Sequence, residues 1–196
     1  MYPELKERYD YFFFPDDDIQ MDTAAINALF EAMRRYRLQI AQPVLSMSYY
    51  TWRHTLQDRY CKLRYINFVE MMVSCFSREA LNKVLFTFNE NETGWGTETH
   101  WPVLIDASQR DMAVIDEVSV VHTRPIQSGQ AIHNRELAAY LRKYNLSTKV
   151  LHYDCLPSES VYCCDRNTFR ELCKTLGYWI GTERISAFSA GEDGYF

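Results

Sequence analysis

The stretch YDYFFFPDDDI, Tyr9–Ile19, decides the fold, because it joins an apolar run to three consecutive acids. Residues 9–14 are aromatic except for Asp10, and this run stops at Pro15, which predicts a buried strand whose last residues reach a cleft. Asp22 is a suitable N-cap, and the apolar residues after it recur at helical spacing. The stretch therefore predicts a strand, an acidic turn and a helix.

The rest of the chain continues the alternation of strands and helices. After the first helix we predict extended residues 38–48 with a break at Pro43, a polar loop at 51–64, and a buried strand at 66–76. A helix capped by Ser77, a helix at 101–105 and two β-branched runs within 112–122 follow. The last predicted elements are amphipathic helices at 134–144 and 167–176, the second with Gly177 as its C-cap, and a loose tail from 181. This alternation predicts an α/β layered fold. We place a boundary at residue 130, with a C-terminal helical extension over 131–196.

The bulk composition narrows the class of protein. The chain has 196 residues, of which 47% are hydrophobic and 24% charged, which suits one globular domain with a core. A net charge of -5 gives no basic field for a polyanion, so we expect no nucleic-acid partner. No apolar stretch approaches the roughly 20 residues of a membrane helix, and the charged N-terminus does not resemble a signal peptide. We therefore expect a cytoplasmic protein without a transmembrane segment.

The cysteines support the same compartment. The sequence contains Cys61, Cys75, Cys155, Cys163, Cys164 and Cys173. They include no C-x-x-C pair and no Cys/His ligand spacing, so neither a zinc knuckle nor a disulfide framework is indicated. We expect reduced thiols.

The three aspartates are candidates for a metal site. Asp16 and Asp18 are two residues apart, so in an extended chain they project to the same side, while Asp17 faces the other way. Paired carboxylates are hard oxygen ligands that suit Mg²⁺ or Mn²⁺ and leave coordination positions free for phosphate oxygens. A solvated acidic turn that caps the next helix explains the same residues, since helix N-termini attract acids.

The pentapeptide GWGTE, residues 94–98, is a candidate sugar site. Glycines on both sides of Trp95 allow a sharp turn that presents a flat indole face, on which a sugar ring can stack. Glu98 is suited to take a proton from a sugar hydroxyl. The alternative is a turn before a helix, with a core tryptophan and a glutamate stabilised by the helix dipole.

Three further residues have a functional and a structural interpretation. His122 ends a β-branched run, where an imidazole either completes a metal's ligand set or is structural. Arg124 either meets a phosphate or pairs with a carboxylate. Glu70 lies inside an apolar run and either pairs with a base such as Arg64 or lines the site; we expect the pairing.

Five motifs in order resemble a known family. FPDDDI, AQPVLS, NFVEMM, GWGTETHW and IDEVSVVHTRP together resemble family 707 of the domains of unknown function, which is similar to glycosyltransferases of the GT-A fold. The resemblance spans about residues 9–125. It implies an incomplete GT-A-like mixed sheet flanked by helices, because GT-A enzymes carry a Rossmann-like half before the D-x-D strand, and only eight residues precede Tyr9 here. On this interpretation the sequence is a fragment or a degenerate relative.

The resemblance also assigns roles to residues. Asp16 and Asp18 match the metal- and nucleotide-sugar-binding D-x-D, Gly94, Trp95 and Gly96 match the glycine loop beside the acceptor, Glu98 matches the catalytic base, and His122 matches the histidine that completes the metal shell. We further expect Asp17, Glu70, Trp101 and Arg124 to contact substrate. The family has Asp where this chain has Glu98, which lengthens the reach of the carboxylate by one methylene.

Three functions are therefore expected in order of preference. The first is a glycosyltransferase that uses Mn²⁺ or Mg²⁺, a nucleotide-sugar donor and a glycan acceptor. The second is a non-catalytic carbohydrate-binding or scaffolding protein with Trp95 and Trp101 as stacking platforms. The third, a magnesium-dependent phosphohydrolase, lacks recognisable partner motifs after the aspartates. A parallel sheet without its first strands also exposes an apolar edge, which favours association with another chain.

Overall fold

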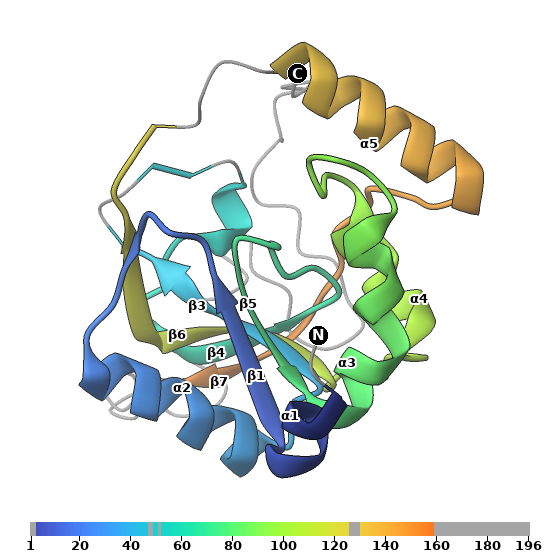
Figure 1. Ribbon diagram of the computed structural model, residues 1–196. Helices are drawn as coiled ribbons and strands as arrows, with labels where there is room; N and C mark the ends of the chain where they lie inside the picture. The colour runs from blue at the N-terminus through green and yellow to red at the C-terminus, as the bar shows by residue number, and fades with distance from the viewer. Residues whose placement is uncertain (1–2, 47–48, 51, 126–129, 159–196) are drawn as a thin grey trace.

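The computed structural model describes residues 3–46, 49–50, 52–125 and 130–158 (Figure 1). In chain order these form α1 (Pro3–Arg8), β1 (Tyr11–Pro15), β2 (Ile19–Gln20), α2 (Thr23–Tyr36), β3 (Ile40–Leu45), η1 (Arg53–Thr55), β4 (Cys61–Ile66), β5 (Val73–Ser77), α3 (Arg78–Val84), η2 (Leu85–Asn89), η3 (Thr97–Thr99), α4 (Trp101–Leu104), β6 (Met112–His122), α5 (Gln130–Tyr144) and β7 (His152–Pro157). The helix predicted at 167–176, its C-cap Gly177 and the predicted tail lie outside the described residues.

The strands form one mixed sheet. Its order is β1-β5-β3-β6-β4-β7, and β2 pairs with β6 beside this path. Strands β3 and β6 run parallel, whereas the other described neighbours run antiparallel. The prediction of an α/β fold with a mixed sheet flanked by helices is confirmed. The edge strands of this order are β1 and β7, and association through a sheet edge stays a prediction.

Helices cover both faces of the sheet (Figure 1). On one face α2 packs Leu29 and Met33 into a core with Leu63 and Ile115. On the other face α3 and α4 build a second core around Phe76 and the fully buried residues of these helices. The two faces together bury the apolar residues of the central strands, so the ends of the strands are left to carry polar groups.

Helices α2 and α3 begin at the capping residues that the sequence predicts. The Asp22 side chain accepts a hydrogen bond from the N–H of Ala25, which caps α2. The Ser77 hydroxyl accepts from the N–H of Ala80 and caps α3 in the same way. Each cap begins a helix directly after a strand: α2 follows β2 and α3 follows β5.

The apolar run at 66–76 is not one strand. β4 ends at Ile66 and β5 begins at Val73, and a turn lies between them. The N–H of Glu70 donates to Gln42 Oε1 (2.6 Å), and the Ser74 hydroxyl donates to the carbonyl of Met71 (3.0 Å). Because a buried turn is as apolar as a strand, the sequence pattern does not separate the two. The predicted loop at 51–64 is wrong at its end, since β4 already begins at Cys61.

Strand β6 is one strand of 11 residues, where the sequence predicted two runs. Its pairing with β3 shifts register between Pro43 and Val44, which are opposite Ile115 and Ser119 respectively. The residues between these partners bulge, and the bulge carries Asp116. Acidic Asp116 at this bulge interrupts the apolar pattern, so the sequence predicts two runs where the structure has one strand.

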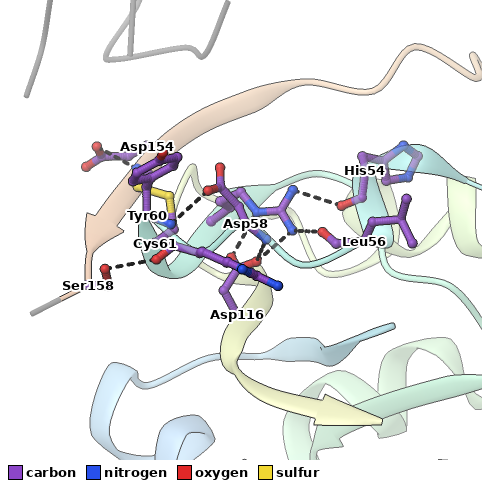
Figure 2. Close-up of a disulfide and its surroundings, with 11 residues drawn as sticks. His54, Leu56, Asp58, Tyr60, Cys61, Asp116, Asp154 and Ser158 are labelled. Atoms are coloured by element: carbon purple, nitrogen blue, oxygen red, sulfur yellow. Dashed lines mark hydrogen bonds and ion pairs between the residues drawn. A yellow bond between two sulfur atoms is a disulfide. The ribbon is translucent and has the colours of Figure 1, made fainter. Parts of the chain in front are cut away.

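The prediction of reduced cysteines is wrong for one pair. Cys61 and Cys155 form a disulfide that joins β4 to the edge strand β7, across 94 residues of sequence (Figure 2). Cys75 is a buried free thiol, and the other cysteines lie outside the described residues. No pattern in the sequence indicates β7, and the spacing of the cysteines does not show which of them pair. Disulfides persist in oxidising compartments, so the cysteines do not support a cytoplasmic location. That location stays a prediction.

Beside the disulfide, Arg64 has a different partner from the one expected. Its guanidinium makes a two-pronged ion pair with Asp116, with Nε 2.9 Å from Oδ2 and Nη2 2.9 Å from Oδ1. Its remaining donors reach the carbonyls of His54 and Leu56, which Figure 2 also shows. Arg64 is therefore paired with Asp116 and not with Glu70.

Candidate functional site

One cavity of about 370 Å³ lies where the acidic turn, the glycine loop and the end of β6 meet. Its size falls within the roughly 300–1,000 Å³ of small-molecule sites. The predicted site residues that line it are Asp16, Asp17, Asp18, Glu70, Gly94, Trp95, Glu98, His122 and Arg124. Gly96 and Trp101 do not line it. We call this cavity the central pocket.

Strand pairing brings the acidic turn to the end of β6. β1 ends at Pro15, and after the turn Ile19 of β2 pairs with His122. The backbone N–H and the hydroxyl of Thr123 both donate to the carbonyl of Asp18, at 3.0 and 2.9 Å. Two segments more than 100 residues apart in sequence are thereby held against each other.

Asp18 is the centre of a charged cluster. Its Oδ2 lies 3.2 Å from Nε2 of His122 and 3.1 Å from Nε of Arg124. Nη2 of Arg124 lies 2.5 Å from Oδ1 of Asp17. Burial raises the pKa of Asp16, and the neighbouring Asp18 raises it further, while His122 opposes the shift. The turn therefore concentrates negative charge that Arg124 and His122 only partly offset.

The orientation of His122 is set by a backbone carbonyl. Nδ1 lies 3.1 Å from the carbonyl oxygen of Tyr49, which only accepts hydrogen bonds, so Nδ1 carries a proton. Nε2 is thereby directed at Asp18. Metal-binding histidines use the same arrangement, in which one nitrogen donates to a carbonyl and the other faces the ion.

The donor types in the turn suit a divalent cation. Asp16 and Asp18 offer hard carboxylate oxygens and His122 an imidazole nitrogen. Within the described ranges there is no group of three His, Cys, Asp or Glu side chains already arranged around a metal position. A cation held here would therefore depend on the two carboxylates and on oxygens of its ligand.

The glycine loop is built for close approach of the backbone. Gly94 and Gly96 have φ of 78° and 95°, in the left-handed region that favours glycine. A Cβ on Gly94 would collide with the sulfur of Met71, and one on Gly96 would lie 3.0 Å from Cδ1 of Leu137 in α5. Gly96 is thus a structural residue under α5 and does not itself contact the pocket.

Glu98 is a buried carboxyl at the wall of the pocket. Burial raises its pKa to about 7, although the N–H of Gly96 donates to its Oε2 at 3.1 Å. A carboxyl with a pKa near neutrality exists in both protonation states at physiological pH. It can therefore accept or give a proton to a ligand in the pocket.

One wall of the pocket is aromatic. Trp95 stacks on the ring of His133 from α5, with centroids 4.7 Å apart and ring planes at 13°, and Trp52 lies 6.4 Å from Trp95. The Glu136 carboxylate fixes α5 here by accepting from the N–H and hydroxyl of Thr93, and α5 is seen beside this loop in Figure 1. Trp52 and His133 line the pocket and were not predicted. Trp52 lies in the segment that the sequence predicts as a polar loop, residues 51–64, whereas nothing in the sequence marks His133.

Trp101 belongs to the core and not to the pocket. It is fully buried, its Nε1 donates to the Thr87 hydroxyl at 3.1 Å, and its ring packs against Phe76 and Phe88. It cannot present a face to a sugar, so its proposed role as a stacking platform is wrong. Glu70 does line the pocket, which agrees with the alternative that the sequence left open for it.

Comparison of the chain with protein-family models, with curated proteins and with solved structures finds no match. The resemblance to family 707 therefore stays a prediction. Among the helices of the described residues, none is long and apolar enough to cross a membrane.

Proposed function

We propose that the chain is a metal-dependent glycosyltransferase with a GT-A-like site, which moves a sugar from a nucleotide-sugar donor to a glycan acceptor. One observation carries the proposal. The aspartate pair, the glycine-flanked Trp95, Glu98 and His122 were selected from separate parts of the sequence, and they line one cavity. Carboxylates for a metal ion, an indole face for a sugar ring and a buried carboxyl for proton transfer are the groups that sugar transfer from a nucleotide donor uses.

The acidic turn is the donor end of the pocket in this proposal. Asp16 and Asp18 would hold Mn²⁺ or Mg²⁺, and Nε2 of His122 is directed at Oδ2 of Asp18. The cation supplies positive charge that stabilises the departing nucleoside diphosphate. Without such a cation, the surrounding carboxylates would repel a diphosphate.

The aromatic wall and Glu98 are the acceptor end. Trp52 and Trp95 give apolar surface for the C–H face of a sugar ring. Glu98, with its raised pKa, accepts the proton of the acceptor hydroxyl as the oxygen bonds to the donor sugar. The proton is left on Glu98, and the diphosphate leaves with the electron pair of the broken bond.

Isothermal titration tests the donor end. Mn²⁺ is titrated into the chain alone and together with a panel of nucleoside diphosphates, and we expect binding of the diphosphate only in the presence of the metal. The double variant Asp16→Asn/Asp18→Asn should lose both. Asp10→Asn is a suitable control, because Asp10 is exposed and pairs with Arg78 outside the pocket. An absence of heat with every diphosphate would count against the proposal.

The aromatic wall also favours a second candidate. Two tryptophans in one pocket suit a non-catalytic carbohydrate-binding protein equally well. Binding on a glycan array that persists in EDTA, without hydrolysis of sugar nucleotides, would favour this candidate over the transferase.

A further inference from the structure

We infer that Arg124 is the resident counter-ion of the acidic turn, and that it exchanges Asp17 and Asp18 for a phosphate of the donor when a divalent cation binds. This inference rests on the proposed function. On this inference, the Arg124 side chain makes the binding of the cation and the binding of the diphosphate cooperative.

Arg124 occupies one carboxylate oxygen that a cation would need, that of Asp18, and it also pairs with Asp17. Its Nε lies 3.1 Å from Oδ2 of Asp18, the same atom that faces Nε2 of His122. Its Nη2 lies 2.5 Å from Oδ1 of Asp17. A guanidinium and a divalent cation cannot both take this position, because their positive charges repel at such short range.

The arginine is held loosely, while its surroundings are fixed. The side chain of Arg124 is 45% exposed and that of Asp17 is 88% exposed, whereas that of His122 is 8% exposed. Exposed ion pairs are weak because water screens them and because long side chains lose rotamer freedom. The backbone beside Arg124 stays in place through the two hydrogen bonds from Thr123 to Asp18. The guanidinium can therefore change partner without movement of the strand.

Charge balance sets the order of events. Five carboxyl groups line the central pocket, those of Asp16, Asp17, Asp18, Glu70 and Glu98, and Arg124 is the arginine among the described lining residues. A diphosphate that arrives first meets carboxylates and an arginine that is already paired with Asp17 and Asp18. A cation that arrives first takes the carboxylates and releases Arg124, whose planar fork of N–H groups matches phosphate oxygens.

The test compares Mn²⁺ binding by the wild type, Arg124→Gln and Arg124→Lys in calorimetric titrations of the full chain. We expect Arg124→Gln to bind Mn²⁺ about 3- to 10-fold more tightly, since the competing charge is gone. Arg124→Lys keeps the charge, so its Mn²⁺ affinity should stay near that of the wild type. With Mn²⁺ saturating, both variants should bind UDP and ADP about 10-fold more weakly, because the fork is lost.

Arg110→Gln is the matched control, because Arg110 is an exposed arginine paired with Asp154 and does not line the pocket. It should behave as the wild type in every titration. Mn²⁺ binding by Arg124→Gln but not by the wild type also supports the inference, since it means that Arg124 masks the site. Equal Mn²⁺ affinities in the wild type and Arg124→Gln overturn the inference; the proposed function still stands if the wild type binds Mn²⁺ and UDP. If no variant binds Mn²⁺, both fail.

Discussion

His122 Nε2 lies 3.2 Å from Asp18 Oδ2, although 104 residues separate them in sequence. The contact exists because β2 pairs with the end of β6, so that the acidic turn is held at the strand end. It joins the acidic turn to the end of β6, which are two of the segments that form the candidate site.

Gly96→Ala should destabilise the fold by about 1–3 kcal/mol, because it forces a side chain into the left-handed region against Leu137. Urea denaturation measures the loss. Val103→Ala removes an exposed side chain and should change stability by less than about 0.5 kcal/mol. Equal stabilities of Gly96→Ala and the wild type would mean that α5 does not pack on the glycine loop as described.

Glu98 should make stability fall as pH rises. Its pKa in the fold is about 7, above the ordinary 4.5, so between these values the folded state binds more protons than the unfolded state. The free energy of unfolding then decreases from about pH 4.5 to 7, by up to about 3 kcal/mol, and levels off above 7. In Glu98→Gln this part of the pH dependence should vanish. Denaturation at pH 5 and pH 8 compares the two proteins; identical pH profiles would refute the buried carboxyl.

Reduction of the Cys61–Cys155 bond should cost about 2–5 kcal/mol of stability, because the bond restricts a long loop of the unfolded chain. Chemical denaturation with and without a reductant measures it. The double variant Cys61→Ser/Cys155→Ser should match the reduced wild type and be insensitive to the reductant. If the reductant leaves the wild type unchanged, the bond is absent in solution.

Trp95→Ala should weaken binding of a glycan ligand by about 0.5–1.5 kcal/mol, the usual contribution of a ring stack. Trp101→Phe should leave glycan binding unchanged, because Trp101 is fully buried in the core. It should nevertheless lower stability by about 1–3 kcal/mol through the lost hydrogen bond to Thr87 and poorer packing. Glycan titrations followed by tryptophan fluorescence, with urea melts, separate the two effects.

The features predicted correctly from sequence depend on neighbouring residues. Pro15 ends β1, and Asp22 and Ser77 cap the helices that follow, because each acts on backbone within a few residues. The same local signals put Asp16–Asp18 at a strand end. The α/β class followed from the alternation of strands and helices, whereas the mixed sheet was implied by the family resemblance, and the GT-A identity stays a proposal.

The features that were missed depend on contacts across many residues. Strand β7 and the bond of Cys155 to Cys61 require pairing between β4 and β7, and 94 residues separate the two cysteines. The pairing of Arg64 with Asp116 needs the bulge of β6, and His133 reaches Trp95 only because α5 packs on the glycine loop. No local pattern encodes such neighbours.

Paramagnetic broadening by Mn²⁺ tests the central claim that one bound ion lies between the acidic turn and the end of β6. NMR spectra of histidine-labelled protein resolve five imidazoles, and His122→Gln identifies the signal of His122. Substoichiometric Mn²⁺ should broaden the His122 signal first and leave those of His54 and His152, which lie outside the pocket lining, sharp for longer. Equal broadening of all five signals, or broadening of His54 and His152 before His122, would contradict the account.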